Sequence, residues 1–287
     1  MTDAIHAVDS AQIGDPGCAT HTYLMRSIVP FLRDPYAQFA EARGDKAGSL
    51  DPLAGSPAFN FLTGSGGFTQ VFTYGLTGMR WRENAVHLDP MLPPQLSGGV
   101  TLTGLHWQGR TFDIQIGATT TTVTSRAGGS FPVEAPGGMR TVSAGGKLSL
   151  PTRRPDLVPT TNLARCKPAT ATSEEPGMYA EAAVDGSRAT IWAPTATTAS
   201  VTVDLRQKQT VGRVVTRWTD TLPSSSRILT SPNGNTWTAA TVGPDGTLAS
   251  PRTARYVRVE MTRSGTVRTG LRELEVYGGG GGGGGGG

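Results

Sequence analysis

The sequence has few of the residues that build metal centres or disulfide frameworks. Its 287 residues include two cysteines, Cys18 and Cys166, which are too few for a framework, although a bond between them stays open. The four histidines lack the spacing of a metal centre. No run of 18 apolar residues occurs, so no membrane span is predicted, and the first residues show no signal peptide.

Charge is also scarce, at 17% of residues, with a net charge of +4. The basic residues are scattered, and Arg153-Arg154 is the only dense pair. Nucleic-acid binding needs a clustered basic surface, so we expect no nucleic-acid partner and no membrane partner, only a mildly basic surface.

Glycine, by contrast, is abundant, with 39 residues, and threonine and serine are frequent too. This composition suits short strands and many turns better than a helical bundle. The length allows about two domains. We therefore predict a mainly β protein with two β-sandwich domains preceded by a few helices.

Residues 1–57 hold the convincing helical pattern, over residues 18–43. Pro30 should break this run and Asp34-Pro35 should start a second segment, which predicts two helices of about ten residues. Short helices need packing partners, which residues 1–17 are not expected to supply. The helices should therefore expose an apolar face. A loop is predicted over 44–57.

Residues 58–150 are predicted to form a short helix at about 67–80 and then a β-sandwich. The stretch "FNFLTGSGGFTQ" places a glycine-rich turn before that helix, and alternating apolar residues follow from Gly99, with a turn at Gln108-Gly109. A phosphate-cradling loop is the rival interpretation of "GSGG". No Lys or Arg follows until Arg80, and the spacing matches no phosphate-binding motif.

Three prolines make residues 151–161 a predicted linker. Residues 162–277 again show short strands, such as "SVTVDLR", "TVGRVVTRWT" and "LRELEVYG", and predict a second β-sandwich. Residues 278–287 are consecutive glycines, which cannot pack and should be disordered.

Residues 162–277 resemble the discoidin, or coagulation-factor C-type, domains, whose microbial relatives form carbohydrate-binding module family 32. The resemblance rests on "NLARCKPATATS", "VDGSRAT", "SPNGNTWTAA", "ARYVRVEMT" and "RELEV", in that order. It implies a jelly-roll sandwich with a carbohydrate ligand and a structural Ca²⁺. It implies Asp185, Thr190 and Glu273 as ligands, with carbonyls near Ala182 and Ser187, and Ca²⁺ does prefer hard oxygens. Otherwise Asp185-Gly186 is only a turn and Glu273 a solvated strand residue.

The same domain contains three tryptophans, Trp192, Trp218 and Trp237. They could stack on sugars, but the resemblance implies that they belong mostly to the core. Sugar-binding residues of the family lie on variable loops, which the sequence does not identify.

Residues of about 10–130 resemble the C-terminal end of glycoside hydrolase family 65 enzymes of the acid-trehalase type. The resemblance rests on "FNFLTGSGGFTQ", "YGLTGMR", "LDPMLPP" and "LHWQGRTFDIQI". It implies the last helices of an (α/α)₆ barrel, with the glycines allowing close backbone approach, and then a β-sandwich. It implies Glu41, in "PYAQFAEA", as the general base; otherwise Glu41 is a solvated carboxylate at a helix end.

An inverting glycosidase needs a second carboxyl group. Family resemblance places that acid upstream of this region, and neither Asp34 nor Asp45 matches it. We therefore expect a truncated C-terminal piece of an inverting α,α-trehalase-like hydrolase, inactive alone, from an extracellular parent enzyme. The alternatives are a non-catalytic carbohydrate-binding protein that acts through its discoidin domain, or a chain that complements a separately encoded barrel.

Overall fold

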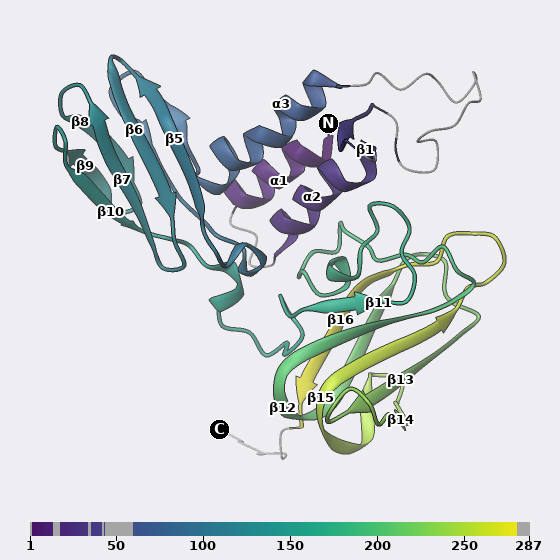
Figure 1. Ribbon diagram of the computed structural model, residues 1–287. Coiled ribbons are helices and arrows are strands. Elements are labelled where there is room, and N and C mark those ends of the chain that lie inside the picture. Colours follow the sequence, from purple (N-terminus) through teal and green to yellow (C-terminus); the bar gives the residue numbers. More distant parts are fainter. Residues whose placement is uncertain (1, 14–17, 34–35, 42, 44–59, 280–287) are drawn as a thin grey trace, which may run out of the picture. The chain divides into compact units, whose positions relative to one another are not determined.

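The computed structural model describes residues 2–13, 18–33, 36–41, 43 and 60–279 (Figure 1). The chain divides into two compact units, residues 1–158 and 159–287, and each is described by itself. The division falls between Val158 and Pro159, inside the segment interpreted as a linker. The predicted loop over 44–57 and the predicted disorder of residues 280–287 lie outside the described residues.

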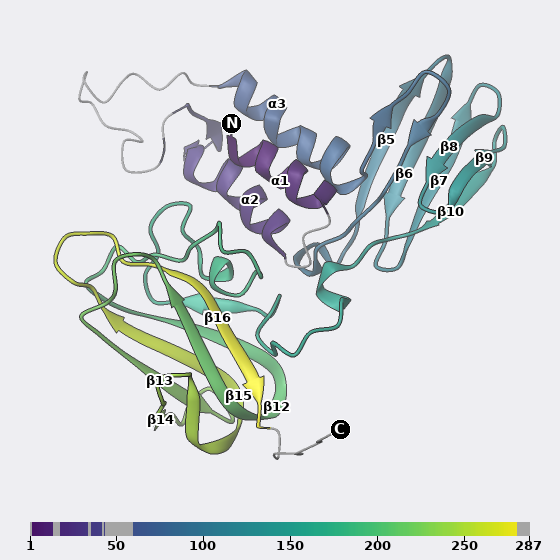
Figure 2. The same ribbon diagram turned by 180° about the vertical axis from the view of Figure 1, so that it is seen from behind.

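Unit 1 begins with three helices that pack side by side (Figure 2). They are α1 (Thr2–Ile13), α2 (Ala19–Ile28) and α3 (Leu62–Gln70), and α3 continues as a π-helical turn over Val71–Leu76. The first helix was not predicted. It buries Ala4, Ala7 and Ala11, whose spacing of three or four residues places them on one face. The expectation that residues 1–17 supply no packing partner is therefore wrong.

The second helix predicted within residues 18–43 is also wrong. After α2, a 3₁₀ turn over Val29–Phe31 leads into β1 (Leu32–Arg33), which pairs with β2 (Gln38–Phe39). The Ala40 N–H donates to the Phe31 carbonyl at 2.9 Å, and the Phe31 and Phe39 rings stack with centroids 5.8 Å apart. Strand pairing and ring stacking therefore outweigh helix propensity after Pro30.

The glycines of "GSGG" lie inside α3, not in a turn before it. A Cβ on Gly64 would lie 2.4 Å from the Phe39 ring and 2.7 Å from the Phe61 ring. At Gly75 a Cβ would lie 3.4 Å from the Val8 backbone of α1. The prediction that these glycines allow close approach is thus confirmed at Gly64 and Gly75, although the groups that approach are Phe39 and α1. Burial of the three helices is incomplete, since Ile5 and Ile13 of α1 and Leu62 of α3 remain exposed.

The rest of unit 1 is a β-sandwich, as predicted. One sheet has the order β10-β7-β6-β5 and the other β3-β4-β8-β9. Phe112, Ile114, Phe131 and Val133 are fully or almost fully buried in its core. Gln108 and Gly109, with φ of 45° and 74°, form the predicted turn between β5 and β6. The strands are β3 (Arg80–Trp81), β4 (Val86–His87), β5 (Val100–Trp107), β6 (Arg110–Ile116), β7 (Thr120–Ala127), β8 (Phe131–Ala135), β9 (Gly138–Val142) and β10 (Lys147–Pro151).

The start of the predicted linker is folded into unit 1. Arg153 donates from Nε to Asp89 Oδ1 at 2.8 Å and from Nη2 to the Ala11 carbonyl at 2.7 Å. Arg153 therefore ties the end of the sandwich to α1.

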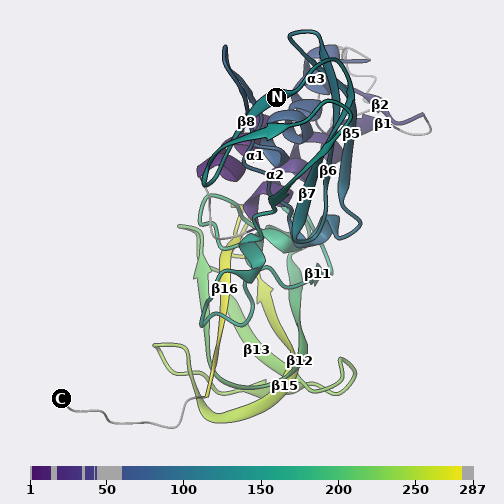
Figure 3. The same cartoon turned by 90° about the vertical axis from the view of Figure 1, so that its left-hand side faces the viewer.

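Unit 2 is the second predicted sandwich, and its long strands curve along the whole unit (Figure 3). The first half of β12 pairs with β15 and its second half with β16. β12 is therefore continuous where two strands were predicted, with register shifts between Asp204 and Gln209 and beside Val211. The strands are β11 (Ala169–Ala171), β12 (Thr198–Trp218), β13 (Ser225–Ser231), β14 (Thr238–Ala240), β15 (Thr247–Thr262) and β16 (Leu271–Gly278).

None of the helices among the described residues is long and apolar enough to span a bilayer.

Candidate functional sites

A loop in unit 2 carries Asp185, one of the predicted calcium ligands. The loop follows a 3₁₀ turn over Ala180–Ala183, and its Gly186 has a φ of 83°. Asp185 Oδ1 accepts the Ser187 N–H at 2.9 Å, and Oδ2 accepts the Thr190 hydroxyl at 2.8 Å. Both Asp185 and Thr190 are buried. The structure therefore brings these two predicted residues together.

Glu273 on β16 completes the predicted set, and it is 4% exposed. Neither of its carboxylate oxygens has a hydrogen-bond partner among the described residues. Burial, and then the negative charge of Asp185, raise the pKa of Glu273 to about 9. The Gly186 amide lowers that pKa, but it does not reach hydrogen-bonding geometry. Ionising a buried carboxyl group without a partner is costly, and a cation bound between Glu273 and Asp185 would offset that cost.

Backbone contacts fix the loop against the start of β16. Trp192 and Leu271 exchange N–H···O bonds of 3.0 and 2.8 Å, and Arg272 donates to the Arg188 carbonyl at 2.9 Å. A Cβ on Gly270 would lie 2.8 Å from the Trp192 carbonyl, so close approach requires glycine there. Backbone pairing therefore holds Asp185 and Glu273 close to each other despite the repulsion between their like charges.

The donor set fits a hard cation. It offers two carboxylates, the Thr190 hydroxyl and the Ser187 carbonyl, which lies 3.2 Å from that hydroxyl. In the described part of the chain, no three His, Cys, Asp or Glu side chains lie so that they could hold one metal ion together. Oxygen donors with few charges suit Ca²⁺, whereas zinc prefers nitrogen and sulfur.

The three tryptophans of unit 2 lie in different settings. Trp192 is completely buried in the core, and Trp218 packs partly buried against it. Trp237 is half-buried under the Arg258 guanidinium, whose Cζ lies 3.8 Å from the ring centroid. The core role implied by the resemblance is confirmed for Trp192.

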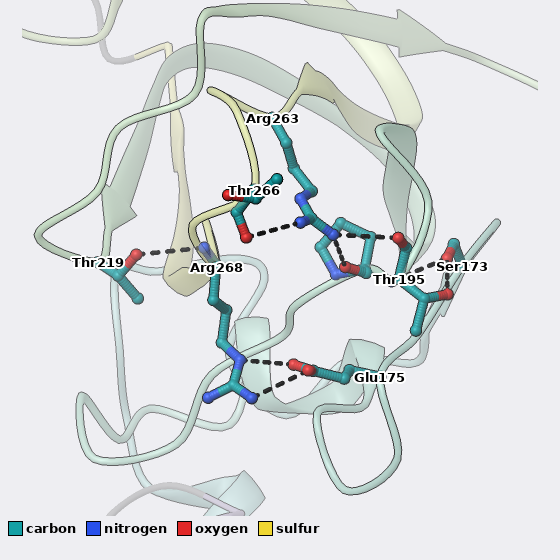
Figure 4. A network of polar contacts seen from close by, with 9 residues as sticks. Ser173, Glu175, Thr195, Thr219, Arg263, Thr266 and Arg268 are labelled. Atoms are coloured by element: carbon teal, nitrogen blue, oxygen red, sulfur yellow. Dashed lines mark hydrogen bonds and ion pairs between the residues drawn. The ribbon is translucent and has the colours of Figure 1, made fainter. Parts of the chain in front are cut away.

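A set of polar side chains joins several loops at one end of unit 2, and we call it the loop-end network. Arg268 forms two contacts with Glu175, at 2.6 and 2.9 Å, and Arg263 donates to the Thr195 and Thr266 carbonyls at 3.0 and 3.3 Å (Figure 4). These residues were not predicted, because the two arginines within "TRSGTVRTG" do not by themselves show which loops they join. The network consists of Ser173, Glu175, Thr195, Thr219, Arg263, Thr266 and Arg268.

Glu41 in unit 1, the predicted general base, is exposed and follows β2, so the alternative that it is a carboxylate at a helix end is wrong. Contacts made by Phe39, before Glu41, and by Arg43, after it, fix the position of the segment that carries Glu41. The Phe39 carbonyl accepts the Phe61 N–H at 2.7 Å, and Arg43 Nη2 donates to the buried Asp3 at 3.0 Å. Asp34 and Asp45 lie outside the described residues.

Comparison with known families assigns a class to each unit. Residues 79–142 match the C-terminal domain of glycosyl hydrolase family 65, and residues 168–274 match the F5/8 type C domain. The chain therefore carries the C-terminal domain of a family 65 glycosyl hydrolase, followed by an F5/8 type C, or discoidin, domain. Both resemblances found in the sequence are confirmed.

Individual relatives agree with this assignment. The chain is 30% identical over 257 residues to the cell wall acid trehalase of Arthroderma benhamiae, covering 80% of this chain and 24% of the relative. It is 31% identical to the acid trehalase of Emericella nidulans, covering 75% of this chain and 22% of the relative. The chain thus spans about a quarter of the length of these relatives. A solved chitosan-binding module from Paenibacillus sp. IK-5 is 38% identical over 42% of this chain and all of that module, with a TM-score of 0.36.

Proposed function

We propose that this chain is the C-terminal part of an inverting α-glucoside hydrolase of the α,α-trehalase type, with an appended carbohydrate-binding domain. One observation carries the proposal. The acid trehalase relatives align with up to 84% of this chain, so the likeness includes both units in the same order.

Glu41 is the general base of this proposal. Its exposed carboxylate, on a segment fixed by Phe39 and Arg43, would take a proton from the attacking water. The acid that protonates the leaving oxygen belongs, by family resemblance, to the body of the barrel, for which this sequence has no counterpart. The isolated chain is then expected to be inactive.

Unit 2 contributes carbohydrate binding. We assign the sugar contact to the loop-end network, because Arg263 and Arg268 fix its loops before a ligand arrives and so reduce the entropy lost on binding. A bound Ca²⁺ would neutralise Asp185 and Glu273 and hold the loop that carries Asp185 against β16. Since named relatives are cell wall, periplasmic or secreted enzymes, we place the parent enzyme outside the cell.

A chimera tests the hydrolase part. This chain would replace the aligned region of the Emericella nidulans acid trehalase, and trehalose cleavage would be followed by proton NMR. Inversion releases one β- and one α-glucose from each trehalose, whereas retention releases only α-glucose. A folded chimera that leaves trehalose intact would contradict the proposal.

The second candidate is a carbohydrate-binding protein without catalysis. It is favoured by unit 2, which is a compact unit with its own buried core. Calorimetry with this chain and tri- and hexasaccharides of the maltose, cellulose and chitosan series tests it. Glycan binding by this chain, together with an inactive chimera, would select this candidate.

A further inference from the structure

Two grooves flank the first residues of β13 in unit 2, Ser225 to Arg227, which pair with β15 but not with β14. The edge groove, of about 400 Å³, lies between β13, β14 and the second half of β12. The face groove, of about 340 Å³, lies where β12, β15 and β13 meet. Ser226 and Arg227 line both, so the two grooves adjoin at these residues.

The face groove begins beside the loop-end network. Thr262 lines this groove, and the next residue, Arg263, belongs to the network. The Ser224 N–H donates to the Thr262 carbonyl at 2.9 Å, and the Arg263 N–H donates to the Thr197 carbonyl at 2.8 Å. A ligand at the loop end could therefore extend through the face groove, past Arg227, into the edge groove.

The side chains along these grooves present hydrogen-bonding groups that have no partner in the described part of the chain. Arg227 Nε contacts Glu260 Oε2 at 2.5 Å, which fixes the guanidinium and leaves its two Nη groups free. The Ser226 and Thr216 hydroxyls also have no partner among the described residues.

The backbone of β12 adds a donor and an acceptor. β12 pairs with β15 only as far as Arg213, but with β16 as far as Trp218. The Val214 N–H donates to the Gly246 carbonyl at 2.8 Å, so it points away from β16. Because backbone groups alternate in direction along an antiparallel pair, the Thr216 N–H and C=O point to the same free side.

This chemistry defines the ligand class. Hydroxyl, amide and guanidinium groups alternate with small apolar surfaces from Val215, Val242 and Pro244. Arg227 is already paired with Glu260, and Asp245 accepts hydrogen bonds from Thr247, so the grooves offer no uncompensated positive charge to an anionic ligand and suit a neutral one. No aromatic ring lines either groove, so binding there is weak without a stronger site nearby.

We propose that the two grooves bind the continuation of a neutral polysaccharide chain whose end is held by the loop-end network. The proposal rests on the carbohydrate-binding role proposed for unit 2. It makes unit 2 a domain that recognises chain length and not only a terminal sugar.

The test is calorimetry with this chain and the tri- and hexasaccharide of the neutral series, maltose or cellulose, that it binds; binding of the cationic chitosan series alone would contradict the proposed ligand class. The hexasaccharide should bind about 5- to 100-fold more tightly than expected from the trisaccharide, for two added hydrogen bonds. A longer saccharide can also occupy one site in more alternative positions, which raises its apparent affinity without any groove contact. This statistical gain is the same in the wild type and in the variants. We define the length ratio as the affinity for the hexasaccharide divided by the affinity for the trisaccharide. The readout is therefore the change of this length ratio between wild type and variants.

Arg227→Ala and Thr216→Val should each lower the length ratio by about 2- to 10-fold and leave trisaccharide affinity unchanged. Arg252→Ala, on β15 outside both grooves, is the matched control and should change nothing. Hydrogen exchange should show hexasaccharide protection at the Thr216 amide.

An unchanged length ratio in both groove variants, with no protection at Thr216, would overturn the proposal while leaving glycan binding intact. Binding of no saccharide by the wild-type chain would instead remove the proposed role of unit 2, and the groove proposal with it.

Discussion

The two carboxylates singled out by the sequence lie in opposite physical settings. Glu41 of unit 1 is exposed, and it has no charged partner among the described residues. Glu273 of unit 2 is buried, faces the charge of Asp185, and has a pKa raised to about 9. The proposed role of Glu41 depends on a second carboxyl group that this chain does not supply. Glu273, by contrast, lies beside Asp185 in surroundings that a bound cation would stabilise.

The difference shows what a partial chain can reveal. A cation site is local, because the loop of Asp185 and the strand of Glu273 are joined by backbone pairing at Trp192 and Leu271. A glycosidase site is shared between two carboxyl groups on distant parts of a barrel. The structure of this chain therefore supports the first assignment by electrostatics and the second only by the family relationship.

The largest expected effect concerns Glu41. In the trehalase chimera, Glu41→Gln should lower kcat by about 10²- to 10⁴-fold, because the amide cannot accept the proton of the attacking water. Circular dichroism should be unchanged, since the side chain is exposed. If this variant turned over trehalose as fast as the wild type, Glu41 would not be the general base. The comparison with Glu273 would then fail.

Calcium removal should have the next largest effect. Without a cation, the folded state holds a proton on Glu273 that the unfolded state releases, between the ordinary pKa of 4.5 and about 9. The free energy of unfolding of the metal-free chain should therefore fall as pH rises through this window. Near pH 8, EDTA should lower the melting temperature of unit 2 by about 5–10 °C, and near pH 5 by much less.

Glu273→Gln is the control for that measurement. It removes the carboxyl group that titrates, so its melting temperature should show neither the pH dependence nor the effect of EDTA. Melting curves of the wild type that EDTA leaves unchanged at both pH values would argue against the cation site.

Glycine substitutions in α3 should give opposite results within one helix. Gly64→Ala places a Cβ against the Phe39 and Phe61 rings and should destabilise unit 1 by about 1–3 kcal/mol. Gly66→Ala meets no atom within 4 Å and should stabilise it by about 0.5–1 kcal/mol. Urea denaturation of both variants checks the pair, and equal effects would mean that Phe39 does not pack against Gly64.

The smallest effect is expected at the loop end. Glu175→Gln weakens an ion pair whose Arg268 side chain is 55% exposed, so it should cost about 0.2–1 kcal/mol of unit 2 stability. High salt should abolish the difference, because exposed pairs are screened. A loss above this range that persists in high salt would mean that Glu175 has a structural role beyond the ion pair.

Sequence patterns predicted the sandwiches well because their signals are local. The alternation in "LHWQGRTFDIQI" and the turn at Gln108-Gly109 depend on neighbouring residues alone. The helices were predicted less well. The hairpin at Phe39 depends on stacking with Phe31 and on the space above Gly64, and this contact spans 25 residues. Helix α1 was missed because half of its buried residues are alanine and two others, Asp3 and Ser10, are polar, which gives a weak amphipathic signal.

The candidate sites divide in the same way. "VDGSRAT" and "RELEV" identified Asp185, Thr190 and Glu273 because the family pattern fixes their spacing, and the structure brings Asp185 and Thr190 into contact. The loop-end network could not be predicted. Arg268 meets Glu175 across 93 residues, and only the folded arrangement of the loops reveals the contact.

The most direct test is a calorimetric titration of the metal-free chain with Ca²⁺ near pH 7, repeated in two buffers of different ionisation enthalpy. The account predicts one ion bound per chain with release of about one proton, since Glu273 must give up its proton to become a ligand. Asp185→Asn should abolish both the calcium binding and the proton release. Binding without proton release, or no binding at all, would contradict the account.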